Sequence, residues 1–388
     1  MTASLPTVID TAADQAAAVV LKKLHHHPIK KLLEHRRTYR PYHPLISIHE
    51  STTLGDVLRT LSDHAILAVP VYSIPEEEPT GKQFTGIISV YDILAWTVFQ
   101  KMFDGLHVSK PSASIDLASF QRIQKEQAHY FDTPVKVLVG MTSESVDSWT
   151  LHSSDPISSL VQMFATGRYH RCLVIDEDAL VASALLDDDG PGPTAPPTGS
   201  SITMITQTDV IRYLYDMRSS IDVSAVETIF SLHASQVEEL QKRQEDNKKS
   251  NGRRVVAVPQ NVSALAAFRI MYENMVRAVP IVDPHNRIIA NLSASDLRGI
   301  TPGKLDQLLL PVFEFLETGI HREPNQLKAD QLRDVNKSAQ LGEVIESMID
   351  TGIHRVWVTG YRDKIAGVVT MTDVLCAFVP VSQALEEE

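Results

Sequence analysis

Apolar positions along this chain switch between two periods, and the same switch recurs four times. Stretches such as AQLGEVIESMIDTG place apolar residues at three- and four-residue steps, here Leu341, Val344, Ile345 and Met348, a spacing that predicts an amphipathic helix. The β-branched run that follows, such as VWV or VPIV, is typical of a buried strand. Read in order, each repeat predicts strand, helix, strand, turn, strand and helix. We therefore expect four βαββα repeats.

A common ending marks the four repeats. It consists of a short apolar run, then Ser or Thr, two residues, Asp and an apolar helix, as in GIISVYDILAWTVF and GVVTMTDVLCAFV. The motif residues are Ser89 and Asp92, Thr206 and Asp209, Ser293 and Asp296, and Thr370 and Asp373. Since internal repeats indicate supersecondary units that pack on one another, the predicted fold class is α/β (α+β) with four tandem βαββα repeats.

The spacing within the repeats supports this alignment. Arg277 precedes Asp296 by the same distance as His354 precedes Asp373. The corresponding distances in the first two repeats are longer, and the surplus contains the turn-forming stretches PEEEPTG and DDDGPGPTAPPTGSS. Stretches rich in Pro, Gly and acidic residues do not build a core. We therefore place both insertions in the turn between two strands.

The repeats divide the chain into predicted segments. They are an N-terminal basic helical lead-in at 1–40, repeat 1 at 41–105, repeat 2 at 135–220 with a loop insertion at 184–201, repeat 3 at 250–303 and repeat 4 at 324–385. One small sheet cannot easily bury both of its faces, so neighbouring repeats are expected to pair. A charged helix ending in 241–254 separates repeats 2 and 3, which predicts a domain boundary near residue 245.

Composition excludes several classes of function. The 388 residues carry 36 Lys and Arg against 48 Asp and Glu, a formal net charge of −12, which disfavours general binding of nucleic acid or an anionic membrane. The two cysteines, Cys172 and Cys376, provide neither a disulfide framework nor a thiolate zinc cluster. No stretch of about 18–20 apolar residues predicts a membrane helix, and the start MTASLPTVIDTAADQ has no secretory pattern. We expect a cytoplasmic protein, with the nucleus as a second location.

The strands that open with basic residues indicate a family. The segments HRCLVID, VRAVPIVD and HRVWVTG precede the S/T-x-x-D helices of repeats 2, 3 and 4. The pattern of helix, HR-x-x-V strand and S/T-x-x-D helix resembles the cystathionine-β-synthase (CBS) domain, here in four copies. Four tandem copies with these His-Arg pairs resemble the γ regulatory subunit of AMP-activated protein kinase, over roughly residues 40–385.

This resemblance implies two paired CBS modules in a disk, with AMP, ADP or ATP held in clefts between repeats and without a catalytic residue, metal or cofactor. In that family the motif aspartate takes the ribose hydroxyls and the basic strand residues reach the phosphates. The nucleotide-binding residues it implies here are Asp92, Asp209, Asp296, Asp373, His170, Arg171, Arg277, His354, Arg355, Ser89, Thr206, Ser293 and Thr370. It also implies α-type catalytic and β-type scaffold kinase subunits as partners, while the absence of nucleic acid and membrane partners is expected from the acidic charge alone.

Physical chemistry supports part of this assignment and leaves alternatives. An ionised carboxylate can accept both hydroxyls of a ribose diol, but at the first turn of a helix it also caps exposed N–H groups. A cap would repeat as well, so repetition does not separate the two roles. The motif hydroxyls suit phosphate or backbone capping equally. The basic strand residues discriminate better, because burying an unpaired cation costs several kcal/mol and an anion would offset that cost. Their alternative is an exposed strand end with acidic neighbours.

The sequence also departs from the family pattern. Familiar γ subunits replace one motif aspartate by a basic residue, whereas here all four are present. The VRAVPIVD context, usual in the first repeat, occurs in the third, and repeat 1 has Leu67 where a base would reach phosphate. On charge alone, the C-terminal pair of repeats is the better equipped, while the N-terminal pair depends on His170 and Arg171.

The segment 21–37, LKKLHHHPIKKLLEHRR, predicts a basic helical stretch broken near Pro28. We favour a solvated lead-in to repeat 1 over docking on an acidic partner. His25, His26 and His27 are adjacent in this segment, so they would point in different directions on a helix and do not predict a metal site.

The function predicted from these features is a non-catalytic, adenine-nucleotide-sensing regulatory subunit, γ-like, of an AMP-activated-type kinase complex. The alternative is a CBS-repeat scaffold or interaction protein with degenerate nucleotide sites, which Leu67 and the displaced arginine favour. S-adenosyl ligands are a further alternative, although paired cations favour a phosphate. An enzyme with a regulatory CBS module is disfavoured, because no residues remain for a catalytic domain and no P-loop, G-x-S-x-G or H-E-x-x-H motif is present.

Overall fold

The fold is described from a computed structural model of the chain. The structure describes residues 8–41, 43–75, 82–101, 116–141, 150–176, 202–237, 255–318, 334–360 and 364–380. The predicted loop insertion at 184–201 and the charged segment 241–254 lie outside the described residues.

Each of the four repeats forms one three-stranded sheet, in which the first two strands pair in parallel and the last two antiparallel. Repeat 1 contains β1 (Ile48–His49), α3 (Leu54–Asp63), β2 (Ala68–Ser73), β3 (Gln83–Ser89) and α4 (Val90–Leu94). Repeat 2 contains β4 (Thr150–His152), α6 (Ile157–Ala165), β5 (Arg171–Ile175), β6 (Ile202–Thr206) and α8 (Gln207–Asp216). Repeat 3 contains β7 (Val258–Pro259), α12 (Ala264–Glu273), β8 (Ala278–Val282), β9 (Ile288–Ser293) and the 3₁₀-helix η5 (Ala294–Leu297). Repeat 4 contains β10 (Asp334–Asn336), α14 (Leu341–Thr351), β11 (Arg355–Thr359), β12 (Ile365–Thr370) and α15 (Met371–Cys376).

The backbone confirms the register in which the repeats were aligned. In every repeat the first residue after the last strand donates its N–H to the carbonyl just ahead of the second strand. These bonds run from Val90 to Leu67 (3.0 Å), Gln207 to His170 (3.2 Å), Ala294 to Arg277 (3.0 Å) and Met371 to His354 (3.2 Å). The positions of Leu67, His170, Arg277 and His354 are therefore structurally equivalent, as the sequence spacing predicted.

The last helix of repeat 3 differs from the prediction. An apolar helix was expected after Asp296, but η5 stops at Leu297 and the next residue, Arg298, leaves the helical conformation. Gly299 has a φ of 81° and Pro302 opens the following 3₁₀-helix, η6 (Pro302–Leu309). A left-handed glycine followed by a proline cannot continue an α-helix, so the chain turns at this point.

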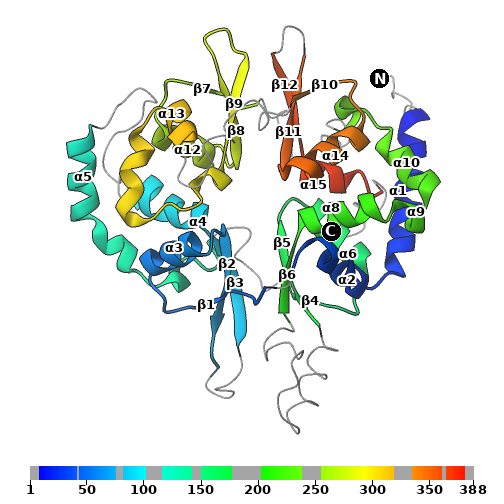
Figure 1. The fold of residues 1–388 in the computed structure, drawn as a ribbon, viewed down its shortest axis with the longest axis horizontal. Coiled ribbons are helices and arrows are strands. Elements are labelled where there is room, and N and C mark those ends of the chain that lie inside the picture. Colours follow the sequence, from blue (N-terminus) through cyan, green and yellow to red (C-terminus); the bar gives the residue numbers. More distant parts are fainter. Residues whose placement is uncertain are drawn as a thin grey trace, which may run out of the picture.

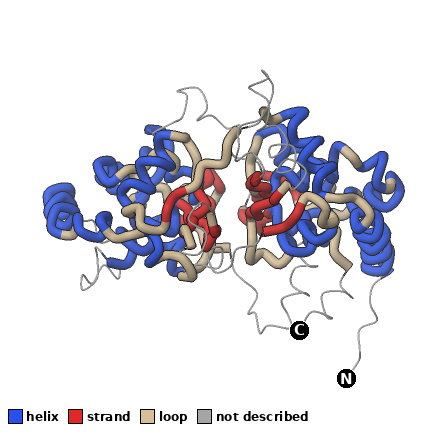
Figure 2. Tube along the Cα trace, turned by 90° about the horizontal axis from the view of Figure 1, so that it is seen from below, coloured by secondary structure: helices blue, strands red, loops and turns tan. Residues whose placement is uncertain are grey.

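Two large apolar cores hold the repeats together. One core unites helices of repeats 1 and 3, and the other unites repeats 2 and 4 with the N-terminal helices. Figures 1 and 2 show the result: the strands of all four sheets line the middle of the molecule, and the helices cover its two outer sides. Amphipathic helices bury their apolar stripes best against other helices, which explains why the cores join alternate repeats.

Consecutive repeats meet through their sheets instead. Between repeats 1 and 2 a small cluster contains Ala68 and Ile87, with Met163, Tyr169 and Met204 packed against it. Between repeats 3 and 4 the indole of Trp357 donates to the side-chain oxygen of Asn291 at 3.1 Å. Each apolar core contains one repeat from before residue 245 and one from after it, so the boundary predicted there does not separate the two cores. Each repeat has one neighbour on its sheet side and another on its helix side.

The N-terminal segment forms two helices, α1 (Val8–His25) and α2 (Ile29–Tyr39), with the predicted break at Pro28. The expectation of a solvated lead-in to repeat 1 was wrong, because both helices pack into the core of repeats 2 and 4. The buried side chains on these helices include Ala17, Val20, Leu24, Leu32 and Leu33. The basic residues in 21–37 suggested a solvated helix, but the apolar stripe opposite them is continuous and needs a partner.

The junction between α1 and α2 is bonded to the start of α6. The N–H of Ile157 donates to the carbonyl of His27 at 2.8 Å, and the N–H of Ile29 donates to Asp155 at 2.8 Å. The His27 ring nitrogen Nδ1 lies 3.3 Å from the hydroxyl of Tyr213. These contacts tie the predicted histidine run to repeat 2.

The other described segments link the repeats. They are the π-helix η1 (Ala95–Lys101), α5 (Leu117–Glu126), η2 (Ala128–Asp132), η3 (Val135–Val137), α9 (Arg218–Ile221), α10 (Val223–Phe230) and α13 (Val312–Thr318). Within the described part of the chain, every helix is too short or too polar to cross a membrane.

Candidate functional site

The four motif aspartates all lie in the first turn of a helix and complete its capping box with the preceding Ser or Thr. In repeat 1 the carboxylate oxygen Oδ2 of Asp92 accepts from the backbone N–H of Ser89 at 3.0 Å and from its hydroxyl at 2.6 Å. The same two bonds reach Oδ2 of Asp209, Asp296 and Asp373 in the other repeats. Capping therefore uses one carboxylate oxygen in each repeat. The predicted role as a helix cap is present, and a second role at Oδ1 is geometrically compatible with it.

These carboxylates lie almost completely inside the protein in three of the repeats. Asp92, Asp209 and Asp373 are 4%, 2% and 2% exposed. The helix N-terminus stabilises each negative charge through its unsatisfied N–H groups. A buried, charged acceptor held at a fixed position is well suited to orient a polar ligand that enters from the middle of the molecule.

The predicted basic residues converge from different repeats. The pKa of His354 is lowered to about 4, first by burial and then by repulsion from Arg355, Arg171, Arg298 and His170. These neighbours come from repeats 2, 3 and 4. Burial also lowers the pKa of Arg355 to about 10, although Asp296 opposes that shift. We call the set His170, Arg171, Arg277, Arg298, His354 and Arg355 the central basic cluster.

Strand register explains how the cluster forms. Arg171 opens β5 opposite Thr206, and Arg355 opens β11 opposite Thr370, so each base lies beside a motif hydroxyl. Gly352 has a φ of 68° and ends α14 two residues before His354. This left-handed turn, which glycine adopts at no steric cost, directs the chain from the outer helix back to the central sheet.

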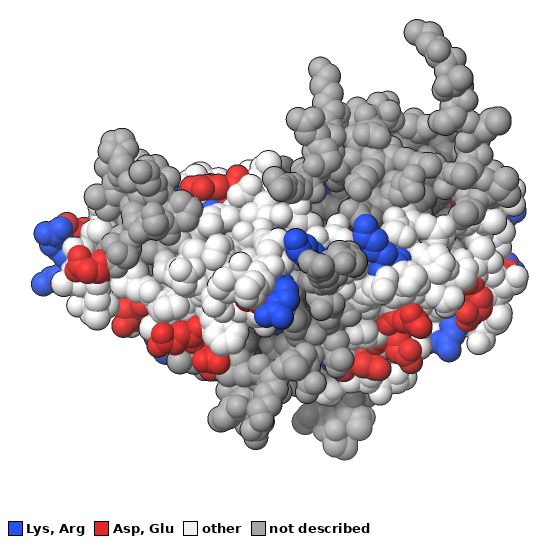
Figure 3. All heavy atoms as spheres, turned by 90° about the horizontal axis from the view of Figure 1, so that it is seen from above, with Lys and Arg blue, Asp and Glu red and all other residues white. Residues whose placement is uncertain are grey.

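The cluster lies inside the molecule yet stays in contact with solvent. His354 and Arg298 are exposed, and Arg171 and Arg355 are half-buried. Burial is nevertheless the largest cause of the lowered pKa of His354 and of Arg355. Solvent therefore reaches these side chains, but their surroundings are mostly protein, which disfavours their charged forms. In the space-filling view, Lys and Arg side chains also lie near the middle of the visible face (Figure 3).

Arg298 is a member of the cluster that sequence reasoning missed. It follows Asp296 by two positions, in the helix that the motif predicted, whereas the bases predicted to bind a ligand all lie at the preceding strand. Because η5 ends there, Arg298 is exposed and close enough to His354 to lower its pKa. A base two residues after the motif aspartate, followed by Gly299, was the signal available in the sequence.

Repeat 1 contacts the central basic cluster through Arg277 of repeat 3. It has Leu67 in the position of the bases, and Arg277 of repeat 3 lies over the ring of Tyr91, with its guanidinium carbon 5.8 Å from the ring centroid. Tyr91 directly precedes Asp92 and is 8% exposed, and burial raises the pKa of its hydroxyl. Repeat 1 thus combines its own carboxylate with a cation from the repeat on its helix side.

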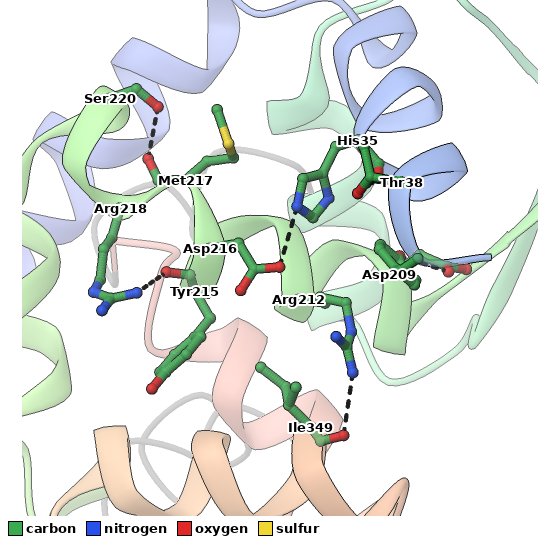
Figure 4. Close-up of polar contacts among 11 residues, drawn as sticks. His35, Thr38, Asp209, Arg212, Tyr215, Asp216, Met217, Arg218, Ser220 and Ile349 are labelled. Atoms are coloured by element: carbon green, nitrogen blue, oxygen red, sulfur yellow. Dashed lines mark hydrogen bonds and ion pairs between the residues drawn. The ribbon is translucent and has the colours of Figure 1, made fainter.

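In repeat 2 the motif carboxylate has additional partners. Oδ1 of Asp209 accepts from Nε of Arg36 at 3.2 Å and from the hydroxyl of Tyr39 at 3.2 Å, and both donors belong to α2. Figure 4 shows Asp209 and Arg212 of α8 next to His35 and Thr38 of α2. No pattern in the sequence predicts that α2 contacts this aspartate, which lies far from it along the chain.

The chain matches a known domain family and is similar in sequence to known proteins. The family model for the CBS domain matches residues 39–98, 252–301 and 334–380, which fall in repeats 1, 3 and 4. Over 363 residues the chain is 23% identical to the SNF1-related protein kinase regulatory subunit gamma-like PV42a of Arabidopsis thaliana, covering 85% of this chain and 90% of that protein. It is 20% identical over 333 residues to Protein SDS23 of Candida albicans, covering 81% of this chain and 46% of that protein.

A solved structure shares the fold. The crystal structure of a Methanocaldococcus jannaschii protein, described as a candidate archaeal homologue of g-AMPK, has a TM-score of 0.52 at 18% identity, covering 88% of this chain and 98% of that one. Repeat 2 lies outside the ranges matched by the family model, but it has the same strand order as the other repeats, and its antiparallel strands start in the same register, with Arg171 opposite Thr206. The chain therefore contains CBS domains, and it is homologous to the γ-like regulatory subunits of SNF1-related protein kinases.

Proposed function

We propose that this protein is a non-catalytic regulatory subunit that senses adenine nucleotides for a kinase complex of the AMP-activated type. The observation that carries the proposal is the central basic cluster, to which repeats 2, 3 and 4 all contribute. Homology to γ-like subunits supports the regulatory role and the α- and β-type kinase subunits as partners.

The chemistry of the cluster matches a nucleotide phosphate. Arg355 and Arg277 are close enough to repel one another, and Asp296 lies near Arg355. A phosphate placed among these cations would relieve their repulsion, and charge-assisted hydrogen bonds to arginine are among the stronger ones in proteins. The aspartates of the capping boxes would accept the ribose hydroxyls. One ligand would then join carboxylate and cations that belong to different repeats.

His354 adds a dependence on phosphate charge. Its pKa of about 4 keeps the imidazole neutral at pH 7 in the ligand-free protein. An adjacent anion raises a histidine pKa, so a phosphate favours the protonated ring. AMP, ADP and ATP bring different charges to the same cluster. They alter kinase output only if they bind its active and inactive assemblies with different affinities.

Calorimetric titration with AMP, ADP and ATP tests the proposal. We expect saturable binding that Arg355→Ala weakens by about 10–100-fold, the equivalent of roughly 1.5–3 kcal/mol for a charge-assisted bond. The matched control is Arg59→Ala, which removes an exposed arginine paired with Asp56 on α3. Equal binding by both variants, or no binding by the wild-type chain, would contradict the proposal. Co-purification with α- and β-type kinase subunits tests whether the protein belongs to a kinase complex.

A second candidate function has a specific observation behind it. Asp209 is bonded to the protein's own Arg36 and Tyr39, and repeat 1 has Leu67 in place of a base. Both features fit a CBS-repeat scaffold whose nucleotide sites are degenerate. The same titration separates the two functions, because a scaffold of this kind would show no heat with any of the three nucleotides and no thermal shift.

A further inference from the structure

The last turn of α2, residues 35–39, is bonded to repeat 2 through three acidic side chains. Arg36 pairs with Asp209, His35 Nε2 lies 3.1 Å from Asp216, and Arg37 lies 3.7 Å from Asp176. The Arg36 and Asp209 side chains are only 16% and 3% exposed. An ion pair with so little exposure is screened weakly by salt and is strongly oriented.

Tyr39 is held at the same carboxylate by its ring as well as by its hydroxyl. The guanidinium carbon of Arg212 lies 4.7 Å from the centroid of the Tyr39 ring, and the His35 ring lies 5.4 Å from it. Burial, followed by the negative charge of Asp209, raises the pKa of the Tyr39 hydroxyl. The phenol therefore stays protonated and donates its proton to Asp209.

These contacts use the atom that a ribose would need. Oδ2 of Asp209 already accepts two bonds from Thr206 in the capping box, and Oδ1 accepts from Arg36 and Tyr39. A ribose diol would have to donate to this carboxylate in the place of the α2 side chains. Docking of α2 and binding of ribose at Asp209 are thus mutually exclusive.

The two halves of α2 are attached differently. Ile29, Leu32 and Leu33 at its start are buried in the core of repeats 2 and 4. The last turn is attached through polar side chains, and Arg37 remains 59% exposed. The last turn can therefore move away from Asp209 while the start of the helix stays anchored, since frayed helix ends cost little compared with an opened core.

We propose that residues 35–39 of α2 are an intramolecular occupant of the repeat-2 site, so that repeat 2 binds an adenine nucleotide only after this turn has left Asp209. The inference rests on the proposed function. The apparent affinity of the site is reduced by the fraction of molecules in which α2 is docked. Any partner that holds the last turn of α2 away from repeat 2 therefore raises the nucleotide affinity there, and nucleotide in the site favours that partner by the same factor.

Binding stoichiometry of AMP by equilibrium dialysis tests the inference. The double variant Arg36→Gln/Tyr39→Phe removes both donors to Oδ1 and leaves the buried start of α2 intact. We expect it to bind one more equivalent of AMP than the wild-type chain, with apparent affinity at repeat 2 at least about tenfold tighter. The matched control, Arg40→Gln, makes the same charge change at an exposed residue next to the turn. Adding Asp209→Asn to the double variant should remove the extra equivalent.

The outcomes separate this inference from the proposed function. If the wild-type chain binds AMP and the double variant binds the same number of equivalents, the inference is overturned and the proposed function stands. Binding by neither protein overturns both. Amide exchange gives a second readout that does not depend on a variant. At AMP concentrations that fill the extra site, exchange over residues 35–40 of the wild-type chain should rise, and unchanged exchange would overturn the inference.

Discussion

Repeats 2 and 4 share their motifs and differ in their surroundings. Both have a His-Arg pair at the start of the second strand and a Thr-x-x-Asp motif that begins at the end of the third, with the arginine opposite the threonine. In repeat 4 the pKa of His354 is lowered first by burial and then by nearby bases, which include Arg171 of repeat 2 and Arg298 of repeat 3. In repeat 2 the aspartate is bonded to α2. Equal motifs therefore do not make equal sites, because neighbouring elements decide which atoms a ligand can reach.

The largest expected effect concerns the anchor of α2. Leu32→Ala removes a fully buried side chain from the core of repeats 2 and 4, and we expect the free energy of unfolding to fall by about 2–5 kcal/mol. Leu117→Ala on α5 changes a leucine that is 51% exposed and should cost less than about 0.5 kcal/mol. Urea unfolding of both variants makes the measurement. Similar values for the two leucines would show that α2 is not part of this core.

The paired substitutions Asp209→Asn and Asp373→Asn test the comparison at the motif itself. Asp209→Asn leaves the nearly buried Arg36 without its carboxylate and should cost about 2 kcal/mol of unfolding free energy. Asp373→Asn weakens a helix cap and should cost about 1 kcal/mol or less.

The same two variants should differ in the opposite direction in nucleotide binding, with the larger loss in Asp373→Asn. We expect Asp373→Asn to lose one equivalent of AMP and Asp209→Asn to bind as the wild-type chain does, because α2 covers Asp209. Equilibrium dialysis measures both. If both variants lost one equivalent of AMP, Asp209 and Asp373 would both bind nucleotide in the wild-type chain, which would contradict the difference between repeats 2 and 4.

The lowered pKa of His354 in repeat 4 predicts that the stability of the folded protein depends on pH. Its pKa in the folded protein is about 4, below its ordinary value of 6.5, so the folded protein takes up this proton less readily than the unfolded chain. The stability contributed by the neutral ring is complete above pH 6.5 and is lost as the pH falls from 6.5 towards 4. Thermal unfolding between pH 7.5 and 4.5 should show a shallower decline for His354→Gln. Parallel curves would contradict the lowered pKa.

The smallest expected effect concerns the direct contact between repeats 2 and 4. The side-chain nitrogen of Gln207 donates to the hydroxyl of Thr372 at 2.9 Å and to the carbonyl of Phe164 at 3.3 Å. Gln207→Met keeps most of the volume and removes both bonds, and we expect it to lower the unfolding free energy by about 1 kcal/mol. A variant as stable as the wild-type chain would mean that these bonds add nothing to the pairing of the two repeats.

Local features of the site could be predicted, whereas its assembly could not. The capping aspartates and the basic strand positions follow from short-range patterns, since a helix start and a strand register are fixed within a few residues. Arg298 and the contact of Arg277 with Tyr91 depend on which repeats become neighbours. The site residues remain predictions for nucleotide binding, which the titrations above test.

By itself, the sequence determined that the chain folds as four βαββα repeats, with bases at the same position in repeats 2, 3 and 4. Hydrophobic period, turn residues and spacing encode such features locally. Only the tertiary structure decided that the cores join alternate repeats, and that α2 lies on Asp209. The physical reason is that burial is non-directional: an apolar stripe specifies that a helix must be covered, but the partner that covers it depends on the packing of the whole chain.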